Sequence, residues 1–274
     1  MNKVVRLMSV GTLVGVLSAT GCDDRGNDAI VFFAGRAVET IGDSILAVTS
    51  SSDNALLVLD LNTNAIDTIG RGIIHSPFHV QFLDGRWYVS DVRDSKPAVR
   101  VFSRATDGEW VLVRDIDLTD HTLVPHQFAV LPDGRVVVEA NDDRLIAVSE
   151  DSVTTFALTE SGPRPSIIVA ARGGVLHAVP DRYITLYNGF GNIRWRTEWP
   201  WSSDAFVTDI AIDQRSRIHV LAGIPKVGEG LFRVYSLVGE TGEVVWWSDP
   251  GERATFSVNF FGDVTADDTG RWFR

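Results

Sequence analysis

A hairpin pattern that recurs six times constrains the fold of this 274-residue chain more than any other feature. Each copy is an apolar strand, a tight turn and a second apolar strand, as in PFHVQFLDGRWYVSD and PHQFAVLPDGRVVVEAND. Successive turns, from Asp43 to Gly270, lie 42, 49, 40, 42 and 54 residues apart. A period of this length is typical of repeat architectures in which each unit packs on the next. The copies occupy residues 37–50, 77–91, 125–142, 165–181, 208–223 and 262–274.

A second pair of strands follows each of the first five hairpins. These pairs occupy residues 54–70, 98–116, 144–158, 183–199 and 231–249. Four strands in every 40 to 50 residues predict an all-β fold, a six-bladed β-propeller of four-stranded antiparallel blades. The second strand of a unit, such as RVVVEA, is apolar at consecutive positions, as expected for a blade covered on both faces. A β-sandwich is the alternative, and it explains the strands but not the period.

The sixth unit contains only one hairpin, so its blade needs a further strand to cover an unpaired edge. The segment AIVFFAG at 29–35 is apolar, strand-like and otherwise unassigned. We therefore predict that this N-terminal segment closes the ring as an outer strand of the sixth blade. A truncated chain is the alternative.

The hairpins resemble those of NHL-type and related six-bladed propellers, including lipoprotein propellers of environmental bacteria. The resemblance lies in the Pro-x-x-apolar start, the Asp-Gly turn and the YVSD ending, and it covers residues 36–274. Two further segments, YNGFGNIRW and VGETGEVVW, resemble the closing hairpin of propellers that bind a quinone cofactor. Only two of the six units carry that tryptophan, so no quinone cofactor is predicted.

The N-terminal segment has the composition of a secretory signal peptide. Lys3 and Arg6 form a short basic start, and the residues from Leu7 to Gly21 carry no charge. That stretch is shorter than the about 20 apolar residues that a membrane-spanning helix needs. Residues 1–21 are therefore predicted to direct export and to be removed. An uncleaved N-terminal anchor is the alternative.

The residues from Ala19 to Cys22 resemble the lipobox of bacterial lipoproteins. The resemblance implies that a diacylglycerol is attached to the Cys22 sulfur and that the chain is cut before this residue. Cys22 is the only cysteine, so an internal disulfide is excluded. We expect a signal peptide at 1–21, a lipidated cysteine and tether at 22–29, and the propeller at 30–274. The protein would be exported and anchored by lipid to a membrane of the cell envelope, and an ordinary signal peptide with a chance cysteine is the alternative.

Charge and motifs narrow the function. The net charge of −11 argues against a nucleic-acid partner. The segment GDSI at 42–45 resembles the nucleophile block of GDSL hydrolases, but no histidine follows an aspartate by three residues, as that family requires. HExxH, CxxC, GxSxG and the phosphate loop are all missing from the sequence. No catalytic residue is therefore assigned.

The six histidines fall into two groups. His177 and His219 occupy equivalent second-strand positions of adjacent units, which predicts a packing role. The other four lie in the connections that lead into the first strands of units two and three, which gather on one rim in propellers. Imidazole suits a divalent transition metal, so a metal at this rim is one hypothesis, and solvated or locally hydrogen-bonded histidines are the alternative. These four are His75, His79, His121 and His126.

The start of each first strand defines the predicted ligand site, around the mouth of the central channel. These positions vary between units, as an asymmetric ligand would require. The predicted ligand-binding residues are Phe78, His79, His126, Gln127, Ser166, Asp209 and Asp263. We expect a binding or scaffold module for a protein, peptide or glycan. The alternatives are a metal-dependent lyase or lactonase-like enzyme at the same mouth and, more remotely, a quinone-cofactor dehydrogenase.

Overall fold

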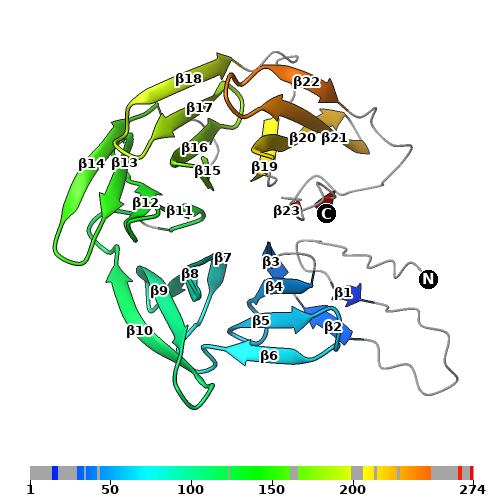
Figure 1. Ribbon diagram of the computed structural model, residues 1–274, viewed down its shortest axis with the longest axis vertical. Helices are drawn as coiled ribbons and strands as arrows, with labels where there is room; N and C mark the ends of the chain where they lie inside the picture. Colours follow the sequence, from blue (N-terminus) through cyan, green and yellow to red (C-terminus); the bar gives the residue numbers. More distant parts are fainter. Residues whose placement is uncertain are drawn as a thin grey trace, which may run out of the picture.

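A computed structural model gives the chain an all-β fold (Figure 1). Among the residues it describes, no helix is long and apolar enough to cross a membrane. The described residues are 14–17, 30–33, 35–41, 44–122, 124–160, 166–198, 206–212, 215–226, 229–247, 265–266 and 272–273.

Five four-stranded antiparallel sheets follow one another along the described chain, each built from two consecutive hairpins as the sequence predicts. Blade 1 contains β3 (Gly35–Ile41), β4 (Ile45–Ser50), β5 (Ala55–Asp60) and β6 (Ile66–Ile69). Blade 2 contains β7 (Pro77–Leu83), β8 (Arg86–Arg93), β9 (Lys96–Arg104) and β10 (Trp110–Asp117). Blade 3 contains β11 (Phe128–Val130), β12 (Val136–Glu139), β13 (Arg144–Val148) and β14 (Val153–Leu158). Blade 4 contains β15 (Ile167–Ala171), β16 (Gly174–Val179), β17 (Tyr183–Asn188) and β18 (Ile193–Glu198). Blade 5 contains β19 (Phe206–Ile212), β20 (Arg217–Lys226), β21 (Glu229–Val238) and β22 (Val244–Trp247).

The first strand of each blade lies toward the centre of a ring, and the fourth lies at the rim (Figure 1). Consecutive first strands contact one another, from β3 to β7, β11, β15 and β19. All blades share one strand order, so the connections that enter the first strands lie on one face of the ring. We call this face the channel mouth.

The sixth unit differs from the prediction of six four-stranded blades. In the described residues it forms a two-stranded sheet of β23 (Thr265–Ala266) and β24 (Trp272–Phe273). β23 contacts β19 on one side and β3 on the other, which is the position of a first strand between blades 5 and 1. The described four-stranded blades therefore number five, because this unit contributes one short hairpin.

The predicted closing strand also has a different partner. β2 (Ile30–Phe33) pairs antiparallel with β1 (Val14–Leu17), from Val14 opposite Phe33 to Leu17 opposite Ile30. No described pairing joins β2 to β24. Both segments, VGVL and IVFF, are apolar, and their pairing satisfies backbone groups of each strand. Cys22 lies outside the described residues.

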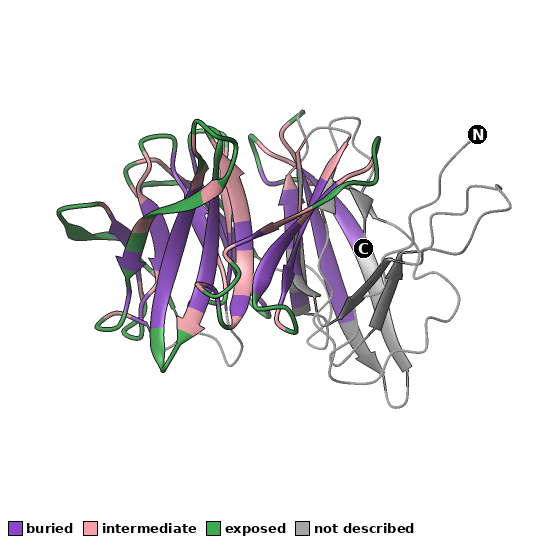
Figure 2. Ribbon diagram, turned by 90° about the horizontal axis from the view of Figure 1, so that it is seen from below, coloured by how far each residue is buried: buried purple, intermediate pink, exposed green. Residues whose placement is uncertain are grey.

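Separate apolar clusters lie between neighbouring blades and hold the ring together. Between blades 1 and 2, Ile69, Trp87 and Phe102 are almost fully buried. Similar clusters join blade 2 to 3, 3 to 4 and 4 to 5. Figure 2 shows this burial in the body of the blades and the exposure of the turns. β16 is buried at all six positions, including His177 within its otherwise apolar sequence GVLHAV.

The Asp-Gly turn of blade 2 shows how the sequence sets a hairpin. Asp84 and Gly85 both have positive φ, 47° and 75°. Two such residues form the turn whose twist matches that of the flanking strands, and Asp-Gly is a preferred pair for it. The register of β7 against β8, and hence the start of β7 at the channel mouth, follows from this turn.

Candidate functional site

Two aromatic contacts join blades 2 and 3 at the channel mouth. Phe78 meets His126 edge-to-face with ring centroids 5.4 Å apart, and His79 meets Phe128 in the same way at 5.1 Å. Phe78 and His79 are half-buried, His126 is exposed and Phe128 is buried. Rings in this geometry attract each other beyond the area they bury.

A register shift in β7 explains how neighbouring residues reach the same blade. The pairing of β7 with β8 shifts between Pro77 and Val80, where Phe78 and His79 lie. A bulge of this kind interrupts the alternation of side chains between the two faces of the sheet and changes their direction. The His79 N–H donates to Ser90 Oγ at 2.9 Å, which fixes the shifted backbone.

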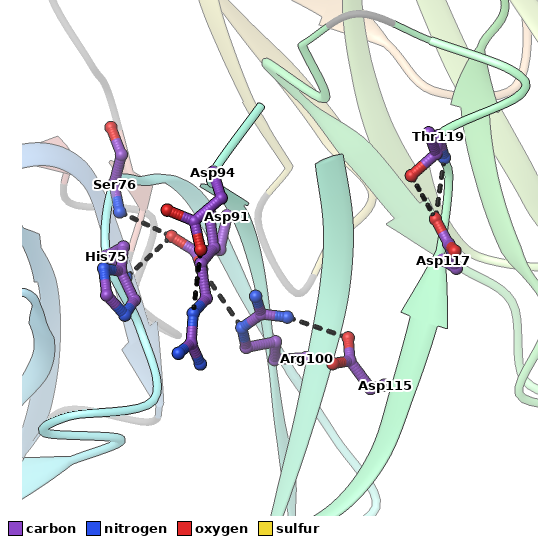
Figure 3. A network of polar contacts seen from close by, with 9 residues as sticks. His75, Ser76, Asp91, Asp94, Arg100, Asp115, Asp117 and Thr119 are labelled. Carbon is purple, nitrogen blue, oxygen red and sulfur yellow. Dashed lines mark hydrogen bonds and ion pairs between the residues drawn. The ribbon is translucent and has the colours of Figure 1, made fainter. Parts of the chain in front are cut away.

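A buried carboxylate holds the connection that enters β7 (Figure 3). Asp91 Oδ1 accepts hydrogen bonds from the His75 N–H at 3.0 Å and the Ser76 N–H at 2.6 Å. Its Oδ2 lies 3.0 Å from Arg100 Nε, and Arg100 Nη1 donates to Asp115 Oδ1 at 2.8 Å. Asp91 and Arg100 are buried, whereas the Asp115 side chain is 52% exposed. The network therefore links the outer strand of blade 2 to the residues just before Phe78.

Side-chain oxygens on or next to three first strands bond to the next first strand. Gln81 Oε1 accepts from the Val130 N–H at 2.9 Å, and Gln127 Oε1 accepts from the Ile168 N–H at 3.0 Å. The Glu39 carboxyl accepts in the same way from the Phe82 N–H. We call these three contacts the inner clasps. They tie blades 1 to 2, 2 to 3 and 3 to 4.

Ser166 lies just before β15 and is buried. Its Oγ donates to Glu139 Oε1 at 2.8 Å, and its N–H donates to Glu139 Oε2 at 3.4 Å. Burial raises the pKa of Glu139, and the two hydrogen bonds from Ser166 oppose that shift. The pair joins the second strand of blade 3 to the entry of blade 4.

Burial also sets the ionisation of two groups on the first strands. It lowers the pKa of His79 from 6.5 to about 4, so this imidazole is neutral at pH 7. It raises the pKa of Glu39 from 4.5 to about 8, against the smaller effect of the hydrogen bond from the Phe82 N–H. Both first-strand groups are therefore mainly neutral at pH 7.

The structure separates the predicted site residues. Phe78, His79, His126 and Gln127 meet at the junction of blades 2 and 3, and Ser166 enters the next blade. Asp209 lies in β19, but its side chain is not described, and Asp263 lies outside the described residues.

The four imidazoles proposed as metal ligands do not form a described metal site. His75 is exposed and His121 is partly exposed, whereas the rings of His79 and His126 contact phenylalanines. Within the described part of the chain, no group of three or more His, Cys, Asp or Glu residues is placed to hold a metal ion.

Sequence reasoning missed the groups that position this site. Asp91 and Ser90 are the last two residues of the YVSD segment, so the repeated polar ending of the second strand was the available signal. Glu139 occupies the matching ending in blade 3. Gln81 and Glu39 are polar residues on first strands, PFHVQFL and GRAVETI, that are mainly apolar, and both are half-buried in the structure.

Neither a protein-family model nor a curated protein matches this sequence. Solved structures do. The chain is similar to virginiamycin B lyase from Staphylococcus aureus, at 14% identity and a TM-score of 0.53, over 81% of this chain and 72% of that one. The chain is a β-propeller. It is also similar to a protein of unknown function from Bacteroides thetaiotaomicron, at 12% identity and a TM-score of 0.61, over 96% and 69% of the two chains. A Malassezia sympodialis allergen, Mala s 1, matches at 9% identity and a TM-score of 0.60, over 87% and 85%. Identities this low establish the propeller fold alone.

Proposed function

We propose that this propeller is a binding module whose ligand, a protein, peptide or glycan, docks at the channel mouth over blades 2 and 3. The exposed His126 imidazole beside the half-buried Phe78 ring carries the proposal. An aromatic surface with a polar group at its edge suits both a sugar face and a peptide side chain. The clasps and the Asp91 network hold these rings in place before a ligand arrives, which lowers the entropic cost of binding.

We further propose that the mature protein is a lipid-anchored, NHL-like propeller of six blades. The position of β23 between β19 and β3 supports a sixth blade. The predicted cut before Cys22 would separate β1 from β2, because β1 ends at Leu17 and β2 begins at Ile30. β2 would then lose its partner and become available to pair with the sixth unit.

The lyase alternative has less support. The matched lyase structures share 10 to 14% identity with this chain, which supports the fold only. The described residues bring together no group of three metal-ligating side chains, and the one described serine–histidine pair of blade 5, Ser236 and His219, is buried between strands rather than at the mouth. A binding role therefore stands as the single proposal for this mouth.

The test compares two surfaces of the mature protein. The double variant Phe78→Ala, His126→Ala removes the proposed contact surface, and Phe190→Ala is the matched control, because Phe190 is 84% exposed on the turn between β17 and β18. Ligands captured from envelope extract by the wild type are identified, and their affinity is then measured by calorimetry. We expect the double variant, folded by circular dichroism, to lose at least about tenfold in affinity, and the control to bind fully. Full binding by the double variant with loss in the control would place the site on the opposite face.

A further inference from the structure

Blade 4 buries an imidazole that has no hydrogen-bond partner in the protein. His177 lies in β16 with none of its surface exposed, and neither Nδ1 nor Nε2 meets a donor or an acceptor. The Tyr183 hydroxyl, on β17, is also buried without a protein partner. The Tyr187 hydroxyl lies near Arg196 and Thr185 but makes no hydrogen bond of good geometry with either. The His177 and Tyr187 rings lie 6.4 Å apart, so these polar atoms share one part of the blade.

The equivalent position in blade 5 shows what a satisfied imidazole looks like. His219 lies opposite Ser236 on the next strand, and the His219 Nδ1 to Ser236 Oγ distance is 3.0 Å. His177 lies opposite Thr185 in the same way. The Thr185 hydroxyl instead accepts from Arg196 Nε at 3.1 Å. In blade 4, Thr185 takes the place of Ser236, and its hydroxyl is hydrogen-bonded to Arg196 instead of to His177.

The surroundings make the unpaired groups costly. Tyr187 packs in an apolar cluster between blades 3 and 4 that includes Phe156, Ile168 and Val175. A buried polar group without a partner loses its hydrogen bonds to water and gains none in the protein, and His177 and Tyr187 bring such atoms to one part of the blade. Most buried polar groups in folded proteins are paired with protein or with ordered water. Arg196 is exposed at the outer strand, so this polar column reaches the surface.

We propose that at least one ordered water molecule binds inside blade 4, on the side that faces blade 3, and bridges His177 to the Tyr187 hydroxyl. Water suits this set because a neutral imidazole accepts at one nitrogen and donates at the other, while a phenol does both at one oxygen. Burial, with a smaller effect of the Arg196 charge, lowers the pKa of His177 to about 4, which keeps the ring neutral at pH 7. Buried waters typically make two to four such bonds.

The direct test is a high-resolution crystal structure of the mature protein. We expect water density within hydrogen-bond distance of one His177 ring nitrogen and of Tyr187 Oη. Magnetic relaxation dispersion of the solvent then counts long-lived internal waters in solution. His177→Phe should lose at least one such water relative to wild type, and the control His219→Phe should lose none, because Ser236 already serves its ring. Absent density together with an unchanged count would overturn the proposal.

Tyr187→Phe keeps the test decisive if His177→Phe fails to fold. This variant removes only the hydroxyl and keeps the packed ring. A water bonded to that hydroxyl predicts a lower urea midpoint for the variant and the loss of a long-lived water. A hydroxyl with no partner at all predicts the opposite, a midpoint equal to or above wild type.

Discussion

The inner clasp of blade 1 gives the sharpest prediction, because it uses a carboxyl group where the next two blades use amides. Glu39 accepts from the Phe82 N–H, as Gln81 accepts from Val130 and Gln127 from Ile168. Glu39→Gln retains the carbonyl acceptor and removes the ionisable group. We therefore expect this variant to be more stable than wild type at neutral pH.

The magnitude follows from the pKa shift. Burial raises the pKa of Glu39 from 4.5 to about 8, so the unfolded chain releases its proton at lower pH than the folded one. Stability from this group is fully present below pH 4.5 and is lost as the pH rises through 8. At pH 7 the loss is at most about 3 kcal/mol, at about 1.4 kcal/mol per pKa unit. For a chain of this size that corresponds to roughly 6 to 12 °C in Tm.

Urea denaturation at about pH 4.5, 7 and 8.5 measures the difference in stability between Glu39→Gln and wild type. These values span the unfolded pKa of 4.5 and the folded pKa of about 8. Glu39→Gln should match wild type at the lowest pH and exceed it increasingly at the other two. Gln81→Glu is the matched control, since it places a carboxyl in the next clasp and should reverse the trend. A gain in Glu39→Gln that does not change with pH, or no gain at all, would refute burial as the cause.

Three further predictions concern charge and anchoring. Asp91→Asn should lower the free energy of unfolding by about 3 to 5 kcal/mol, because it removes the buried carboxylate of the pair and leaves the buried Arg100 only the half-exposed Asp115; Asp115→Asn should cost under about 1 kcal/mol, and equal losses in urea denaturation would contradict the network. In the Glu39→Gln background, stability should fall as the pH drops from 6.5 through 4, since His79 and His177 are neutral when folded and protonate more readily when unfolded; a flat profile by thermal melting speaks against their burial. Cys22→Ala should release the protein from membranes or stall its processing, as measured by membrane fractionation and mass spectrometry of the N-terminus. A variant that is cut normally and stays membrane-bound would contradict lipidation of Cys22.

The repeated hairpins were predictable because their signals are local. A strand such as RVVVEA at 135–140 shows its double-sided burial by composition alone, and the structure buries Val136, Val137 and Val138. His177 and His219 are buried, as their shared place in the repeat predicts. Periodicity identifies the units and the order of strands within them, since each hairpin needs only neighbouring residues.

The partner of a short apolar strand was not predictable in the same way. Ile30–Phe33 was expected on the sixth unit and lies against Val14–Leu17 instead. Four apolar residues carry no register signal of their own, so any apolar edge within reach satisfies them. The predicted six four-stranded blades failed at the same place, because this count depended on that pairing.

At the candidate site, the sequence predicted where residues lie but not which hydrogen bonds their side chains make. Alignment of the repeats predicted Phe78, His126 and Gln127 at one mouth; in the structure the Phe78 and His126 rings contact each other, whereas the Gln127 side chain bonds to blade 4. The alignment could not show that the Gln127 amide oxygen accepts from Ile168, or that Ser166 donates to Glu139. Both bonds cross between blades, so they depend on the rotation of one blade against the next.

This engagement changes which predicted residues can face a ligand. A side chain that already makes a hydrogen bond to the neighbouring blade must break that bond before it can bind anything else, at a cost of about 1 to 3 kcal/mol for the partner left unpaired. Gln127 and Ser166 therefore hold neighbouring blades together at the mouth. The neutral, half-buried His79 lines the mouth between blades 2 and 3. Exposed His126 and the half-buried Phe78 ring beside it are groups of the mouth that solvent reaches. The binding test therefore replaces these two residues. Substitution of Gln127 or Ser166 is expected to change the free energy of unfolding rather than ligand affinity directly.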